Sequence, residues 1–243
     1  MSDVVDNLPE LPDAEIHHQH RDVSGGWLRP TVFGMMDGLV SNFALIAGVA
    51  GASASSSQVA LAGLAGLVGG AFSMSAGEYI SVQSQNESAR AELAVERHEL
   101  EHNAEAELEE LAESYVARGV DRDLAFKVAQ QLSRDPEQAL IVHAQEELGI
   151  DPNSLPSPWT AAVSSLISFS FGAFLPLLPY LLGADTVLIS LIVSAVALFG
   201  AGALTSRFTV RGWQYSGVRQ FVFGAFAAAL TYGVGSLFHV SGG

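Results

Sequence analysis

Long apolar runs with almost no charge restrict this chain to a few kinds of fold. Five of them cover residues 28–52, 59–82, 159–182, 186–205 and 218–238. A helix rises about 1.5 Å per residue, so each run is long enough to cross a hydrocarbon core of about 30 Å. The mean hydropathy of +0.31 and the 15% of charged residues are also unusual for a soluble domain. The sequence therefore predicts an all-α membrane protein with five transmembrane helices.

The charged residues gather in two acidic segments outside most of these runs. The 243-residue chain has a net charge of −15. Residues 1–28 carry six acids and one base, and residues 84–152 carry seventeen acids and six bases. Such acidic blocks repel the phosphate backbone, so no nucleic-acid partner is expected. The absence of cysteine excludes an iron–sulfur cluster, a thiolate zinc site and a disulfide scaffold.

The segment of residues 1–27 is polar and lacks the apolar core of a secretory signal. It is expected to be a cytosolic acidic tail. Its histidines His17, His18 and His20 could touch a metal, but an incidental cluster in a polar tail is the favoured interpretation.

The second acidic segment contains a stretch, residues 92–113, in which nine of 22 residues are glutamate. On one continuous helix, Glu96, Glu99, Glu107 and Glu110 would fall at about 0°, 300°, 20° and 320°, within one narrow arc. Few bases are near enough to relieve their repulsion, so a bound cation is one interpretation and a solvated acidic face is the other. Asn103 could divide this helix in two by capping the second half.

Two shorter helices are predicted after this stretch. Asp121 can cap the first, and Asp135 followed by Pro136 opens the second, which Gly149 closes. On this second helix His143 and Glu147 are four residues apart and share a face.

The arginines indicate the orientation of the chain. Arg207, Arg211 and Arg219 lie between the fourth and fifth runs, so by the positive-inside rule that connection is cytoplasmic. Five spans then place the N-terminus and the acidic insert inside as well, in agreement with Arg29. The connection with Asp185 and the C-terminus would lie outside.

Two acids lie within the apolar runs, where an ionised side chain costs about 2.5–3.5 kcal/mol on insertion scales. Asp37 is in the first run and Glu78 in the second, and no lysine or arginine in a run is expected to neutralise them. Alternate binding of protons and cations by such acids is what a proton-coupled carrier requires. Met74, one turn before Glu78, adds a thioether that suits Fe(II) or Mn(II) better than Mg(II) or Ca(II). Ser41 and Asn42 could line a path, but hydrogen bonding within the bundle is the favoured interpretation.

Two motifs carry a resemblance to a known family. The stretches MDGLVSNFALIAGVAGA in the first run and GGAFSMSAGEYISVQSQ in the second closely resemble the vacuolar iron transporter family, including its bacterial members. The likeness covers about residues 23–240. It implies a homodimer of five-helix membrane domains, each with a cytoplasmic helical metal-binding insert. It also implies export of Fe(II) and related divalent ions from the cytosol in exchange for protons, along the dimer interface.

The resemblance also implies roles for particular residues. The transport path of the family maps onto Asp37, Met74 and Glu78. Its cytoplasmic metal site maps onto Glu96, Glu99, Glu107, Glu110, His143 and Glu147. His143 stands where the family has methionine. Because imidazole is a stronger and pH-dependent ligand, the site is expected to shift toward Zn(II), Co(II) or Ni(II) and to weaken below about pH 6.

Two other hypotheses are open. Glu99 and His102 form an E-x-x-H pair of the kind found in di-iron carboxylate proteins, which would suit a membrane-anchored ferroxidase or iron store. A structural membrane protein could use Asp37 and Glu78 as polar contacts between helices. The transporter hypothesis, with no enzymatic activity, is favoured because it explains the membrane acids and the glutamate spacing together.

These inferences divide the chain into four parts. Residues 1–27 form the cytosolic tail, 28–83 form transmembrane helices 1 and 2, 84–157 form the cytoplasmic metal-binding domain, and 158–243 form transmembrane helices 3 to 5. The expected location is the plasma membrane for a bacterial protein and the vacuolar membrane for a eukaryotic one.

Overall fold

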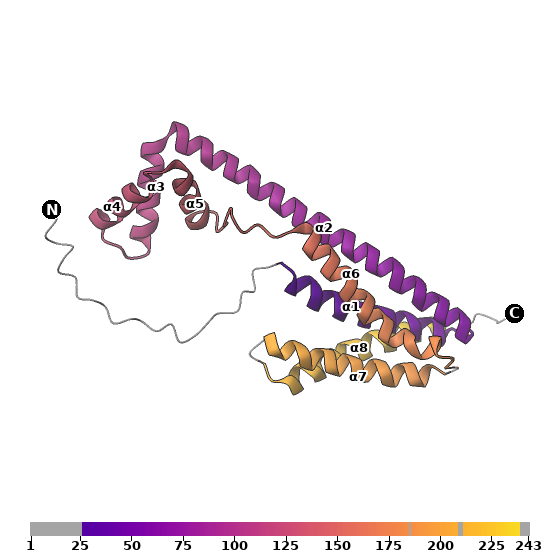
Figure 1. Cartoon of the computed structure of the whole chain (residues 1–243). Helices are drawn as coiled ribbons and strands as arrows, with labels where there is room; N and C mark the ends of the chain where they lie inside the picture. Colours follow the sequence, from indigo (N-terminus) through magenta and orange to yellow (C-terminus); the bar gives the residue numbers. More distant parts are fainter. Residues whose placement is uncertain (1–25, 185, 209–210, 239–243) are drawn as a thin grey trace.

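The computed structural model describes residues 26–184, 186–208 and 211–238. Within these ranges the chain is all-α, as predicted, and contains no strand (Figure 1). Its helices are α1 (Leu28–Gly51), α2 (Ser56–His102), α3 (Ala104–Ala117), α4 (Arg122–Leu132), α5 (Pro136–Glu146), α6 (Pro158–Leu181), α7 (Val187–Thr205), the 3₁₀ helix η1 (Ser206–Phe208) and α8 (Trp213–Ser236). The tail histidines His17, His18 and His20 lie outside the described residues, as does Asp185.

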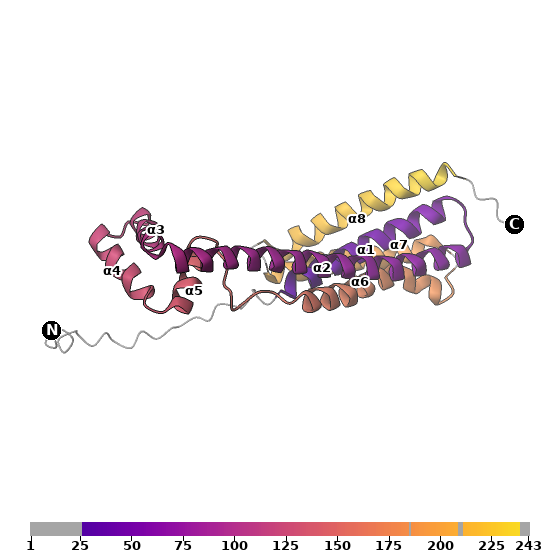
Figure 2. The same cartoon turned by 90° about the horizontal axis from the view of Figure 1, so that it is seen from above.

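Four helices of the described residues are long and apolar enough to cross a membrane: α1, α2, α6 and α7. They correspond to the first four predicted spans. The fifth predicted span falls within α8, which has 24 residues but is not one of these four. Helix α8 packs along α1 and α7 in the same bundle (Figure 2). A fifth membrane crossing therefore stays a prediction.

Helix α2 connects the bundle to the acidic insert. It begins with a capping box, in which the Ser55 backbone N–H donates to Gln58 Oε1 at 2.8 Å and the Gln58 N–H donates to Ser55 Oγ at 3.4 Å. It then continues for 47 residues, or about 70 Å. Figure 1 shows it running along the bundle and beyond it to α3, α4 and α5. No break separates its apolar half from its acidic half.

Close backbone approach holds α1 against α6. A Cβ at Gly172 of α6 would collide with the backbone oxygen of Met35, and a Cβ at Gly38 of α1 would collide with the backbone oxygen of Phe169. Small residues allow such contacts in lipid, where van der Waals packing drives helix association. Helix α6 continues through Pro176 and ends at Leu181, two residues after Pro179.

The insert is a small helical unit with its own core. Leu111, Ala112, Ala129 and Val142 form this core between α3, α4 and α5. The predicted helix starts are confirmed: Asp121 Oδ1 accepts from the Asp123 N–H at 3.0 Å, and Asp135 Oδ1 accepts from the Glu137 N–H at 3.1 Å. Gly149 follows α5 with φ at +65°, a conformation that favours glycine.

Two contacts fasten the insert to the bundle where α2 leaves it. The Asn86 amide donates to the Pro156 carbonyl at 2.9 Å, which ties α2 to the segment that enters α6. The rings of Tyr79 and Trp159 meet edge to face with their centroids 4.9 Å apart. Aromatic side chains of this kind are enriched at membrane interfaces.

The α1–α6 contact generates a stability prediction. Gly172→Ala should destabilise the bundle by about 1–3 kcal/mol, because the added methyl must push two backbones apart. Gly200→Ala is the matched control, since a Cβ at Gly200 meets no atom within 4 Å. Thermal unfolding in detergent measures the difference. Equal melting temperatures for the two variants would show that the glycine contact is not needed.

Candidate metal centre

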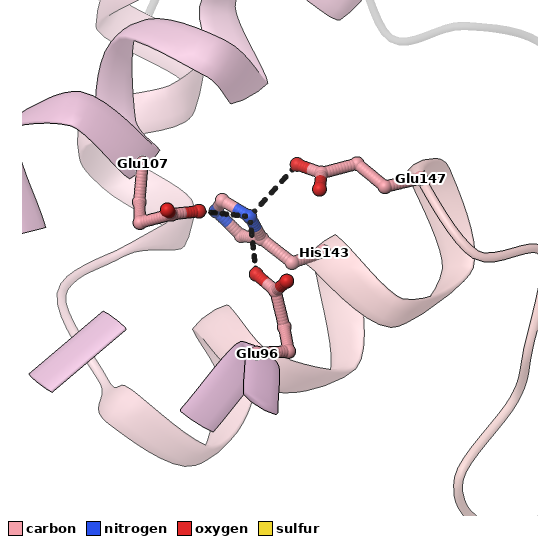
Figure 3. A group of neighbouring side chains, drawn as sticks. All are labelled: Glu96, Glu107, His143 and Glu147. Carbon is pink, nitrogen blue, oxygen red and sulfur yellow. Dashed lines mark ion pairs between the residues drawn. The ribbon is translucent and has the colours of Figure 1, made fainter. Parts of the chain in front are cut away.

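Four side chains from three helices converge in the insert (Figure 3). They are Glu96 of α2, Glu107 of α3, His143 of α5 and Glu147 at the end of α5. His143 Nδ1 lies 3.0 Å from Glu96 Oε1, 3.0 Å from Glu147 Oε1 and 3.6 Å from Glu107 Oε2. One ligand atom from each residue lies within 4.8 Å of the other three. Carboxylate and imidazole at this spacing are a suitable donor set for a divalent transition metal.

A break in the helix brings the glutamates together. On one continuous helix Glu96 and Glu107 would be about 16 Å apart along the axis. Asn103, with φ −127° and ψ 32°, ends α2 and begins α3, so the two glutamates face the same ring nitrogen. The predicted break is confirmed, but its predicted cause is wrong. The Asn103 side chain does not cap α3, because its amide donates back to Glu99 Oε2.

His143 is completely buried, although it carries two polar ring nitrogens. Neither nitrogen makes a regular hydrogen bond to any described residue. The carboxylates around Nδ1 are close but not aligned as acceptors, and Glu96 Oε1 is also buried without a hydrogen-bond partner. Buried polar atoms normally have partners, so this group is better suited to enclose a ligand than to stabilise the apo domain alone.

Ion pairs on the outside of the insert hold the three helices in this arrangement. Arg97 of α2 pairs with Glu137 of α5 at 3.2 Å. Arg118, just after α3, pairs with Glu146 of α5, and the Tyr115 hydroxyl donates to the same carboxylate at 3.4 Å. These contacts fix α5, and with it His143, against α2 and α3.

The crowded carboxylates hold protons more tightly than usual. Burial, followed by the nearby carboxylates of Glu110 and Glu107, raises the pKa of Glu147 to about 7. Burial is also the largest cause that raises the pKa of Glu96 and of Glu107. The neighbouring acids add to both increases, while the His143 ring opposes them. A proton or a metal ion is therefore needed to neutralise this cluster.

Two of the six predicted insert ligands lie at the edge of the cluster. Glu99 is half-buried and accepts from Asn103, and Glu110 is exposed. Both are close enough to raise the pKa of cluster residues, but neither belongs to the group of four. His102, which the ferroxidase hypothesis pairs with Glu99, also lies outside it and forms a 2.8 Å hydrogen bond between Nδ1 and the His98 carbonyl.

The membrane residues form a second polar region between α1 and α2. Asp37 and Met74 line one cavity of about 380 Å³, together with Ser41, Asn42 and Ser73. Asp37 is exposed at the surface of the bundle. The cavity that it lines is therefore reached from an outer face of this chain.

Glu78 does not line that cavity, and its predicted lack of a counter-ion is wrong. It is buried, with 8% of its surface exposed, and its Oε2 lies 3.9 Å from Arg29 Nη1. Arg29 is in the first turn of α1, at the start of the first apolar run. From the sequence, Arg29 indicates only the orientation of the chain, because nothing in the sequence shows that the start of α1 reaches Glu78 of α2.

The chain has apolar helices of membrane-spanning length and, where α2 projects beyond the bundle, a cluster of carboxylates and one imidazole from three helices. These features define a multi-pass membrane protein with a candidate metal centre. A model of the VIT family matches residues 28–236. The chain therefore belongs to the VIT family.

Comparisons with individual proteins give the same family assignment. The chain is 39% identical to a vacuolar iron transporter of Acanthamoeba castellanii, over 98% of this chain and 87% of that protein. It is 34% identical to vacuolar iron transporter 1 of Oryza sativa subsp. japonica, over 93% of this chain and 94% of that protein. It is 32% identical to vacuolar iron transporter 1 of Arabidopsis thaliana, over 92% of this chain and 91% of that protein. All three relatives are named as transporters, as expected for a chain that is not an enzyme.

The raised pKa of Glu147 generates a pH prediction for the metal-free protein. The folded protein holds this proton up to about pH 7, whereas the unfolded chain releases it near the ordinary value of 4.5. The stabilising effect of the proton is therefore full below about pH 4.5 and is lost as the pH rises through 7. In chelator, the amides of α5 should be better protected from hydrogen exchange at pH 6 than at pH 8, after correction for the intrinsic rates.

Glu147→Gln should reduce this pH dependence, because the side chain no longer titrates. Glu101→Gln, at an exposed position of α2, should leave it unchanged. Equal opening free energies at pH 6 and pH 8 for the metal-free wild type would contradict the assignment.

Proposed function

We propose that this protein is a secondary transporter that exports Fe(II), and also Mn(II), from the cytosol in exchange for protons. The observation that carries the proposal is the continuity of α2. One helix carries Met74 beside Asp37 in the membrane bundle and Glu96 in the cluster of the insert. Met74 and Glu96 are 22 residues, or about 33 Å, apart along this helix. The names of the relatives support iron as the transported metal.

In this proposal the insert collects cytosolic metal. Three carboxylates and one imidazole suit Fe(II) and Mn(II), and the imidazole of His143 adds affinity for Zn(II), Co(II) and Ni(II). The acidic surroundings raise the local concentration of cations. Metal that bridges α2, α3 and α5 could also gate transport by favouring one arrangement of these helices.

The exposed carboxylate of Asp37 supports a homodimer. An ionised side chain that faces lipid is costly, so this face of α1 and α2 needs a polar or protein neighbour. A second copy that covers the Asp37 cavity would place the transport path between two chains. Protons compete with metal for Asp37 on such a path, which gives a physical basis for exchange.

The proposed topology has five spans, with α8 as the fifth. Arg211 and Arg219 flank the start of α8, and their charge favours a cytoplasmic position for that end. The N-terminus and the insert are then also cytoplasmic. The protein would act in the plasma membrane of a bacterium or in the vacuolar membrane of a eukaryote.

Flux measurements test the role of Asp37. In proteoliposomes, the wild type should transport Fe(II) when a pH gradient is imposed, and Asp37→Asn should abolish this flux, because the amide neither binds nor releases a proton near neutral pH. Glu101→Gln is the control for loss of one carboxylate, and gel filtration confirms that the oligomer is intact. Absence of wild-type flux, with metal still bound to the insert, would indicate a sensor or store instead.

The residue at position 143 should set the metal preference of the insert. His143→Met replaces the imidazole by a thioether and should lower the ratio of Zn(II) to Mn(II) affinity by roughly tenfold. His98→Ala removes an exposed histidine outside the cluster and should change nothing. Competition titrations on the full chain measure the ratio. An unchanged ratio in His143→Met would remove His143 from the ligand set.

A further inference from the structure

Asn42 of α1 is a buried polar residue whose amide nitrogen makes a hydrogen bond but whose amide oxygen makes none. It is 2% exposed, and its Nδ2 donates to the Ala173 carbonyl of α6 at 2.6 Å. Its Oδ1 is also buried and accepts no hydrogen bond from any described residue. A buried acceptor without a partner costs free energy, so a polar group without a structural use points to a ligand.

The hydrogen bond to Ala173 fixes the orientation of the amide. A backbone carbonyl can only accept, so the nitrogen of Asn42 must face α6 and the oxygen must face the other way. On that side lies the cavity that Asp37 and Met74 also line. Gly66 of α2 leaves room there, because a Cβ at this position would lie 2.8 Å from Asn42 Oδ1 and 2.5 Å from Leu45 Cδ2.

Asn42 lies farther along the cavity than Asp37. Five residues separate them, or about 7.5 Å along the axis of α1. Metal–oxygen bonds are about 2.0–2.6 Å long, well below this axial separation. Asp37 and Asn42 are therefore candidates for two separate cation positions in the cavity.

We infer that Asn42 Oδ1 is the main protein ligand of a second, uncharged cation site in this cavity, beyond Asp37 and Met74. The inference rests on the proposed transport function and specifies a step within it. A partly hydrated divalent cation that leaves the carboxylate and thioether binds next to the amide oxygen, with the nearby Ser41 hydroxyl on the same cavity wall. A neutral ligand holds the ion less strongly than a carboxylate does, and such weak second sites let an ion move on.

Two variants remove the site in different ways. Asn42→Leu keeps the size of the side chain but removes the oxygen. Gly66→Ala keeps Asn42 and its bond to Ala173, and places a methyl group against Oδ1. Gly69→Ala is the matched control in the same helix, since a Cβ at Gly69 meets no atom within 4 Å. Melting temperature and oligomeric state are measured for all three.

Fe(II) flux in proteoliposomes provides the first test. Asn42→Leu and Gly66→Ala should lower the maximal rate by about tenfold, equivalent to 1.4 kcal/mol, and leave the half-saturating concentration almost unchanged, because entry at Asp37 is intact. Gly69→Ala should behave as the wild type. Wild-type maximal rates in folded Asn42→Leu and Gly66→Ala, even with lowered melting temperatures, would assign Asn42 a structural role only and overturn the inference.

Anomalous diffraction from Co(II)-soaked crystals decides the question independently of flux. A Co(II) peak next to Asn42 Oδ1, separate from one at Asp37 and absent in Asn42→Leu, would support the site even for a protein that transports nothing. Occupation of Asp37 alone, with only water beside Asn42, would overturn it. Absence of wild-type flux counts against the proposed function, whereas absence of this peak counts against the second site.

Discussion

An unbroken hydrogen-bonded helix, α2, is the constraint on which the rest of the structure depends. Its first half packs in the bundle, and its second half carries Glu96 to a cluster completed by α3 and α5. Because every turn is bonded to the next, the insert is held at a fixed distance and direction from the cavity of Asp37 and Met74. The contact between Asn86 and Pro156 supports the helix where it leaves the bundle. In the proposed function, collection and transport of metal are then steps of one molecule.

Electrostatic repulsion between buried carboxylates determines how the insert binds protons and cations. Glu96, Glu107 and Glu147 surround a buried imidazole, and burial raises the pKa of all three carboxyls. A divalent cation and protons are therefore alternative ways to neutralise the same cluster, so that metal binding should release protons. The membrane cavity also offers groups that can bind a cation, but it carries fewer charges than the insert. It places one carboxylate, one thioether and one amide oxygen along its walls.

Several features of the fold and of the candidate site could be predicted from the sequence, because they depend on residues that are close together in the chain. Charge-free runs predicted the membrane helices, and Asp121 and Asp135 predicted the starts of α4 and α5. The spacing of His143 and Glu147 predicted that they share one helix face, and both belong to the group of four converging side chains. Glu96 and Glu107 also join it, but through the turn at Asn103 and not through a shared arc of one helix.

Contacts between distant segments could not be predicted in this way. The pair of Arg29 and Glu78 depends on how α1 packs against α2, and the peripheral positions of Glu99 and Glu110 depend on the angle of the turn at Asn103. Which end of the Asn42 amide faces the cavity depends on a carbonyl of α6, 131 residues away. The sequence predicted a fifth span over residues 218–238, but α8 is not among the four described helices that are long and apolar enough to cross a membrane, so this span stays a prediction.

X-ray absorption spectroscopy of the full chain, loaded anaerobically with one equivalent of Fe(II), tests the central claim most directly. We expect a first shell of oxygen and nitrogen, outer-shell scattering from one imidazole, and loss of that scattering in His143→Ala. Bound Fe(II) with an all-oxygen shell and no imidazole signal in the wild type would contradict the claim that Glu96, Glu107, His143 and Glu147 form one metal centre.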